Sequence, residues 1–165
     1  QDTIYTGAKF TRLYFKDCYI DGTTDFIFGP STALFENCMI HSKRNSYVTA
    51  ASTPKEAKYG YIFKHCKLTA EPGVDKVYLG RPWRPYAYTL FIECELGKHI
   101  VPAGWHNWGK QSNEETARYM EYKNTGEGAN VSERVAWSKQ LTKKEAEAVT
   151  VDAIFGTQSN WNPID

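Results

Sequence analysis

The segment "LYFKDCYI" (13–20) has three close relatives further along the chain, at residues 33–40, 61–68 and 89–96. They read "ALFENCMI", "YIFKHCKL" and "TLFIECEL", so each copy places a Phe three residues before a Cys and ends in Ile or Leu. The four cysteines are 20, 28 and 28 residues apart. Self-similarity at such a period is typical of stacked-repeat proteins, and short β-type segments favour a β-solenoid over helical repeats.

A second series of similar segments alternates with the first. It consists of "DTIYTG" (2–7), "DFIFGP" (25–30), "YVTAAS" (47–52), "VYLGRP" (77–82) and "IVPAGW" (100–105). Two short strands per coil, separated by polar and Gly/Pro turns, predict an all-β fold, a right-handed parallel β-helix. Equivalent residues of neighbouring coils then lie ~4.8 Å apart, which stacks the cysteines and places the four Phe side chains at one inward position.

The rhythm changes after residue 110, where the segments no longer follow the coil period. Residues 116–130 and 133–138 ("ERVAWS") are interpreted as further strands around a Gly-containing turn. Thr142, followed three residues later by Glu145, is a candidate N-cap and predicts a short helix.

Length and charge limit what the chain can be. Its 165 residues suffice for one domain with a sizeable core, so we interpret residues 1–165 as a single domain, with solenoid coils over 1–110 and C-terminal strands, a short helix and a tail over 111–165. Twenty basic residues against nineteen acidic ones give a net charge of +1, without the concentrated basic face of a nucleic-acid binder. No apolar run has the length of a membrane span. We therefore expect neither nucleic acid nor a membrane as a partner.

Asp2 and Asp25 occupy the same position in the second series of segments, about one coil apart. Two carboxylates stacked roughly 5 Å apart divide into one that donates a proton and one that attacks. Arg81, two coils further along, is the candidate cation for Asp25, because the intervening coil carries only small residues at 49–52. The alternative is that both acids are turn residues in salt bridges, without a catalytic role.

Three motifs around these residues resemble the pectin methylesterases, a family of carbohydrate esterases built on a right-handed parallel β-helix. They are "QDT" (1–3), "GTTDFIFG" (22–29), in which Thr24 stands where the family has Val, and "LGRPW" (79–83). Their order and spacing carry the resemblance through nearly all of the chain. Landmarks of the family's C-terminal part are matched by "PAGW" (102–105), "YKNTGEGA" (122–129), "RVAWSKQLTKKEA" (134–146) and "WNP" (161–163).

The resemblance implies catalytic roles for three residues: Asp25 as nucleophile, Asp2 as general acid and then base, and Gln1 as an oxyanion-hole donor. It also implies that Arg81 orients Asp25 and contacts the substrate in a sugar-binding cleft. The cleft residues that it implies are Phe28, Trp83, Tyr86 and Trp108. The implied substrate is the C6 methyl ester of galacturonan (pectin), which is hydrolysed with release of methanol and without a metal or organic cofactor. The implied location is secreted or periplasmic.

Parts of the family pattern lie outside this sequence or differ from it. A second catalytic Gln, an N-terminal cap and earlier coils precede it in the family. We therefore expect an N-terminally incomplete domain, whose open first coil pairs with a second copy or is covered by another segment. The segment "TAAST" (49–53) looks like bacterial members. Cys18 and Cys38 match a pair that is bridged in plant members, which implies a disulfide, while Cys66 and Cys94 are expected to be free thiols.

Two other interpretations fit parts of the same pattern. A polygalacturonase or a pectate lyase on a similar solenoid would cleave the polymer, which lowers its viscosity and releases no methanol. A non-catalytic β-helix that only binds polysaccharide has no need for acids at matched positions of neighbouring coils. The sequence contains no GxSxG nucleophile elbow and no HExxH metal-binding pair, so the acid pair is the main enzymatic signal.

Overall fold

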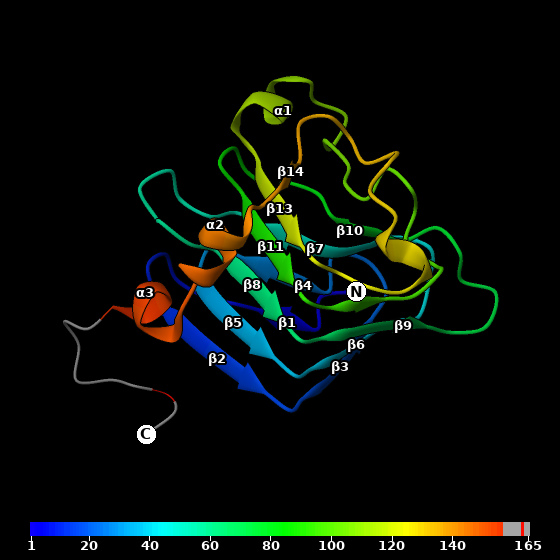
Figure 1. Ribbon diagram of the computed structural model, residues 1–165, viewed down its shortest axis with the longest axis horizontal. Coiled ribbons are helices and arrows are strands. Elements are labelled where there is room, and N and C mark those ends of the chain that lie inside the picture. Colours follow the sequence, from blue (N-terminus) through cyan, green and yellow to red (C-terminus); the bar gives the residue numbers. More distant parts are fainter. Residues whose placement is uncertain (157–162, 164–165) are drawn as a thin grey trace.

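The computed structural model describes residues 1–156 and residue 163, and its strands form a parallel β-helix (Figure 1). Three parallel sheets, which we name sheets A, B and C, run along the helix. In spatial order, sheet A contains β1 (Ile4–Tyr5), β4 (Ile27–Gly29), β7 (Tyr47–Ala51) and β10 (Tyr78–Gly80). Sheet B contains β14 (Lys139–Gln140), β13 (Arg118–Tyr122), β11 (Tyr88–Ile92), β8 (Tyr61–Lys64), β5 (Thr32–Glu36) and β2 (Arg12–Lys16). Sheet C contains β12 (Glu95–Leu96), β9 (Lys67–Ala70), β6 (Met39–Ser42) and β3 (Tyr19–Gly22).

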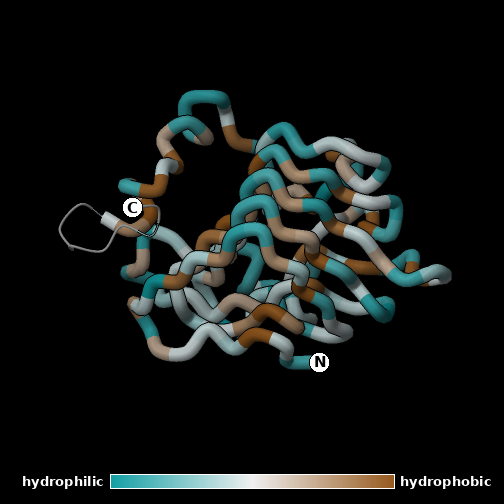
Figure 2. Tube along the Cα trace, turned by 90° about the horizontal axis from the view of Figure 1, so that it is seen from below, coloured by the Kyte–Doolittle hydropathy of each residue, from teal (hydrophilic) through white to brown (hydrophobic). Residues whose placement is uncertain are grey.

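An aromatic ladder fills the centre of the solenoid. Phe15, Phe35, Phe63 and Phe91 are register partners in consecutive strands of sheet B. Their rings stack nearly parallel, with centroid separations of 4.7, 4.5 and 4.4 Å from one coil to the next. The Cα trace shows these coils lying one above another along the molecule (Figure 2). The predicted inward Phe position is confirmed, and offset stacking adds to the burial of each ring.

Each coil contains three strands, where the sequence predicted two. The cysteine segment divides because the residue before each cysteine has a left-handed backbone, which bends the chain from sheet B into sheet C. The φ angles of Asp17, Asn37, His65 and Glu93 are 54°, 54°, 54° and 50°. Repetition of one bend in every coil keeps both flanking strands in register.

The four cysteines stack at this corner as free thiols. The structure does not contain the predicted disulfide between Cys18 and Cys38, and its Cys66 and Cys94 are free thiols as well. Three of the thiols bond along the solenoid to the backbone of the previous coil: the Cys38 Sγ lies 3.5 Å from the Phe15 carbonyl oxygen, and the Cys66 Sγ and the Cys94 Sγ make equivalent 3.4 Å contacts. The Cys18 Sγ donates to the Lys16 carbonyl oxygen of its own coil. Burial raises the pKa of the Cys18 thiol, which keeps it protonated at neutral pH.

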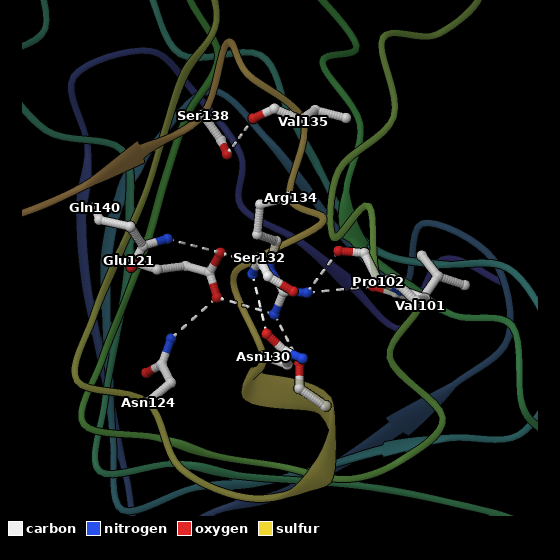
Figure 3. Close-up of polar contacts among 11 residues, drawn as sticks. Val101, Pro102, Glu121, Asn124, Asn130, Ser132, Arg134, Val135, Ser138 and Gln140 are labelled. Carbon is white, nitrogen blue, oxygen red and sulfur yellow. Dashed lines mark hydrogen bonds and ion pairs between the residues drawn. The ribbon is translucent and has the colours of Figure 1, made fainter.

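A buried ion pair ends the aromatic ladder (Figure 3). Glu121 is the register partner of Phe91, and its side chain is only 1% exposed. Arg134 donates to both Glu121 carboxylate oxygens, at 2.9 and 3.2 Å, and to the carbonyl oxygens of Pro102 and Gly128. Because the Arg134 side chain is directed into the core towards Glu121, residues 133–138 form turns and not the predicted strand.

The C-terminal segment of the chain contains short helices. The predicted capping box is confirmed: the Glu145 amide donates to the Thr142 hydroxyl, and the Thr142 amide donates to the Glu145 carboxylate. A hydrophobic cluster joins Ile154 and Phe155 to Leu34 of sheet B. The helices are α1 (Ser112–Thr116), α2 (Lys143–Glu147) and α3 (Val151–Phe155), with a 3-10 turn at Glu127–Ala129. No helix in the described part of the chain is long and apolar enough to span a membrane.

We expect Arg134→Met to lower the free energy of unfolding by about 3 kcal/mol, because it leaves the Glu121 carboxylate buried without its cation. The matched control is Lys143→Met, which removes one partner of an exposed pair with Glu147 and costs at most about 0.5 kcal/mol. Urea denaturation of the two variants measures both values. Equal losses would mean that the buried pair has no special role in ending the ladder.

Buried His99 predicts a loss of stability in acid. It is 3% exposed, its Nε2 has no hydrogen-bond partner among the described residues, and burial, followed by the charge of His41, lowers its pKa to about 4. The unfolded state therefore binds a proton more readily. The stability that neutral His99 provides is complete above pH ~6.5 and is lost as the pH falls towards about 4.

We expect His99→Gln to remove roughly 3 kcal/mol of the difference in unfolding free energy between pH 7 and pH 4. The control is His65→Gln, because that side chain is half exposed beside Glu93. Urea unfolding curves of the two variants and the parent at several pH values measure the slopes. A parent slope that persists in His99→Gln would contradict the assignment.

Candidate active site

The two acids singled out in the sequence lie at equivalent positions of neighbouring coils. β1 and β4 pair with Ile4 opposite Ile27, and Asp2 and Asp25 each come two residues before these partners. Both acids have a left-handed backbone, with φ of 54° and 50°. Asp is among the residues that adopt this conformation most readily, so the corner before sheet A accommodates it without a glycine. The predicted match in position is confirmed.

Arg81 reaches back across one coil to Asp25. Its Nε donates to Asp25 Oδ1 at 3.0 Å and its Nη2 donates to Oδ2 at 2.7 Å, a bidentate pair in which both side chains are largely buried. The backbone of Arg81 follows Gly80, which pairs with Thr49 of the intervening coil. The next residue of that coil is Ala50, whose small side chain leaves room for the guanidinium to pass. The predicted reach is confirmed.

Two rings hold the Arg81 guanidinium from different coils. Its Cζ lies 3.9 Å from the centroid of the Tyr47 ring and 3.8 Å from that of the Trp108 ring. Stacking on aromatic faces fixes the plane of the guanidinium and shields it from water, which strengthens the pair with Asp25. Trp108 was expected in a sugar cleft, and in the structure it contacts Arg81. The sequence analysis did not identify Tyr47, although it occupies the position in the third coil that Asp2 and Asp25 occupy in the first two.

His106 holds Trp108 in place and was also missed by the sequence analysis. Its Nδ1 accepts a hydrogen bond from the Trp108 backbone amide at 3.0 Å. Its ring lies edge-on to Tyr47 and Tyr78, with centroid separations of 5.4 and 5.3 Å. Burial, followed by the charge of Arg81, lowers the pKa of His106, so the imidazole stays neutral and Nδ1 stays free to accept.

An aromatic surface extends from the ion pair along sheet A. Phe28 lies 5.0 Å from Tyr5 and 5.9 Å from Trp83, measured between ring centroids. Tyr5 is 59% exposed and was not among the predicted cleft residues. Tyr86 lies apart from these rings, beneath the Lys55 ammonium group at 5.2 Å. Rings exposed in this way can pack against the apolar faces of sugars.

Gln1 lies at the start of the first coil. It is exposed, and its backbone nitrogen donates to the Thr23 hydroxyl. Among the residues that the structure describes, no group of three or more His, Cys, Asp or Glu side chains is arranged to hold a metal ion.

The arrangement supports acid–base and nucleophilic chemistry by carboxylates. Arg81 donates one hydrogen bond to each Asp25 oxygen and thereby orients the carboxylate. The remaining lone pairs of Asp25 are available to an electrophile. Asp2 is exposed and lies at the equivalent position of the neighbouring coil, so it is a second carboxyl group on the same side of sheet A.

Comparison with known proteins identifies relatives along the whole described chain. The family model described as Pectinesterase matches residues 1–158. Pectinesterase 31 of Arabidopsis thaliana is 43% identical over 147 residues, which cover 88% of this chain and 46% of that protein. Probable pectinesterase A of Neosartorya fischeri is 39% identical over 166 residues, covering 98% of this chain and 48% of the relative. The chain thus spans about half the length of these relatives.

Solved structures give the same result. Pectin methylesterase from carrot superposes with a TM-score of 0.87 at 34% identity, over 94% of this chain and 53% of that one. A pectin methylesterase in complex with a hexasaccharide matches with a TM-score of 0.76 at 29% identity, over 98% of this chain and 59% of that one. The named sequence relatives are from plants and a fungus, so the expected bacterial-like character is wrong. Among the small residues at 49–53, Thr49 bonds to the Leu79 carbonyl oxygen, Ala51 is part of the core, and the Thr53 hydroxyl accepts from the Tyr88 amide.

The hydrogen bond from Trp108 to His106 predicts a difference between two substitutions. His106→Asn should preserve the contact, because an Asn side chain can accept from the amide two residues on, as Asn107 does from Gly109 at 2.8 Å. His106→Ala should release Trp108 from Arg81. NMR of the Arg81 Nε–H measures the outcome: ring currents of Trp108 and Tyr47 shift this signal in the parent and in His106→Asn. In His106→Ala the part of the shift that comes from Trp108 is lost and the part from Tyr47 remains. Unchanged signals in both variants would contradict the role of His106.

Proposed function

This chain belongs to the pectinesterase family, and we propose that its full-length protein hydrolyses the C6 methyl esters of pectin and releases methanol. The observation that carries the proposal is the bidentate Arg81–Asp25 pair, one coil from Asp2 and beside an exposed aromatic surface. A charged, oriented carboxylate next to a second acid is what an aspartyl esterase needs. A protein that only binds polysaccharide gains nothing from it.

The proposed reaction has two steps. Asp25 attacks the ester carbonyl carbon, and Asp2 donates its proton to the departing methoxide, which leaves as methanol. An anhydride then joins Asp25 to the sugar acid. Asp2 then takes a proton from water, and the hydroxide formed cleaves the anhydride. Asp25 is regenerated as a carboxylate, and the sugar acid is released and loses its proton to bulk water. The Gln1 amide is proposed to stabilise the oxyanion in both steps.

The remaining site residues support binding and orientation. Arg81 fixes Asp25 so that its lone pairs face the ester, and Tyr47 and Trp108 fix Arg81. Phe28 and Trp83, with Tyr5, are proposed to pack against the sugar rings, as expected for a protein whose relative was solved with a bound hexasaccharide. Because pectin is an extracellular polymer, we propose that the enzyme is secreted or periplasmic.

Substitution of the nucleophile tests the proposal in the full-length protein. Asp25→Asn should lower methanol release from methylated pectin by at least ~10³-fold, because an amide cannot attack the ester, and Asp2→Asn should lower it by ~10²–10⁴-fold. The matched control is Asp17→Asn, since Asp17 has the same left-handed backbone but lies at the corner between sheets B and C, and it should retain full activity.

The same assay separates the rival activities. Pectin viscosity should stay constant while methanol is released, because no glycosidic bond is cut. A fall in viscosity without methanol would instead indicate a lyase or a glycosidase. Near-normal methanol release by Asp25→Asn would overturn the assigned mechanism.

A further inference from the structure

The turn that holds Trp108 against Arg81 has an unfavourable backbone conformation. Trp108 has φ of 62°, a left-handed conformation that is rare for a bulky side chain and costs free energy. Two side chains within the turn stabilise this conformation. The Trp108 amide donates to His106 Nδ1 at 3.0 Å. The Gly109 amide donates to Asn107 Oδ1 at 2.8 Å, so the turn depends on two side-chain acceptors.

The two acceptors respond differently to acid. Asn107 is a neutral amide that does not titrate, and its Nδ2 also donates to Glu114 at 2.7 Å. His106 accepts only as a neutral imidazole with its proton on Nε2, because a protonated ring carries an N–H on both nitrogens. A proton on Nδ1 points one N–H at another and removes the hydrogen bond from Trp108. The conformation of the turn thus depends on the protonation state of one side chain.

The contacts of His106 connect this turn to Arg81. The His106 amide donates to the Gly80 carbonyl oxygen at 3.1 Å, which fixes His106 beside the residue that precedes Arg81. The His106 ring lies edge-on to Tyr47 of β7 and Tyr78 of β10. The Tyr47 ring also stacks on the Arg81 guanidinium, at 3.9 Å from its Cζ. A change at His106 is therefore transmitted to the guanidinium over a short path.

Arg81 is the charged group that acts on the His106 ring. Burial, followed by the charge of Arg81, lowers the pKa of His106 from its ordinary value of 6.5. The Asp25 carboxylate accepts from Arg81, and the Glu114 carboxylate accepts from Asn107. Within the described part of the chain, no ion pair includes His106. A proton on this ring therefore adds a second positive charge near Arg81, and the two charges repel.

We infer that His106 is a positioning residue whose protonation releases Trp108 from Arg81 and thereby lowers esterase activity in acid. The inference rests on the proposed function and adds a means of regulating the same site. Without Trp108, the guanidinium keeps only the Tyr47 ring, and the Asp25 carboxylate loses part of the orientation that attack requires. The active arrangement is complete above pH ~6.5 and is lost as the pH falls through the lowered pKa of His106.

A pH titration of the full-length protein by NMR tests the inference. The ring signals of His106 report its protonation, and the Arg81 Nε–H signal reports the contact with Trp108. In the parent, both signals should move with the same midpoint, below pH ~6.5. In His106→Asn, the Arg81 signal should lose this step, because an Asn side chain accepts the same hydrogen bond and does not titrate. Any step that remains is attributed to Asp25, which also bonds to Arg81.

Methanol release over the same pH range measures the effect on function. The ratio of kcat at pH 7 to kcat about one pH unit below the His106 midpoint should be roughly fivefold smaller in His106→Asn than in the parent. The matched control is His65→Asn, because that side chain is half exposed at the corner between sheets B and C. It should keep the ratio of the parent. Circular dichroism at both pH values verifies that the proteins are folded.

Three results would overturn the inference: different midpoints for His106 and Arg81 in the parent, an acid step that persists unchanged in His106→Asn, or an unchanged kcat ratio in that variant. The first needs no variant, so it decides the matter even if the substitution prevents folding. Coupled midpoints without methanol release at any pH would keep the contact between His106 and Trp108 and remove the esterase. Methanol release with uncoupled midpoints would keep the esterase and remove the role of His106 in its pH dependence.

Discussion

In-register stacking of parallel coils places residues that are far apart in sequence one strand spacing apart in space. This constraint produces the Phe ladder in the core and the matched acids Asp2 and Asp25 on the surface of sheet A. It also brings Arg81 within reach of Asp25: in the coil between them Ala50 is small, and Tyr47 stacks on the guanidinium. The repeat therefore positions the candidate active site, in which a few coil positions carry reactive or charged residues in place of residues that only pack.

Two carboxylate–arginine pairs have different roles in this fold. Glu121 and Arg134 are almost completely buried and replace an aromatic ring at the end of the core ladder, where Arg134 also bonds to backbone carbonyls of the loop leading to Trp105 and His106. Asp25 and Arg81 keep 14% and 20% of their side-chain surface exposed, which leaves access for a substrate. Burial of the first pair stabilises the fold, while partial exposure of the second permits chemistry.

Spacing alone predicted the features that depend on the coil period or on local backbone hydrogen bonds: the Phe ladder, the acid pair, the reach of Arg81 and the Thr142 capping box. The three-strand coil was missed because the left-handed corner is occupied by Asp, Asn, His and Glu, which share no identity. The alternating "ERVAWS" imitates a strand, but Arg134 turns inward to Glu121. Tyr47 and His106 were missed because their contacts join side chains of different coils, which periodicity does not reveal.

The central claim is that Asp25, held by Arg81, forms a covalent bond with the substrate. Rapid acid quenching of full-length protein during turnover of a methyl-esterified oligogalacturonide, followed by peptide mass spectrometry, tests it most directly. The account predicts a galacturonyl adduct on the peptide that contains Asp25, converted to a hydroxamate of Asp25 when hydroxylamine is present. An adduct on another residue, or methanol release with no adduct on Asp25 at any quench time, would contradict the account.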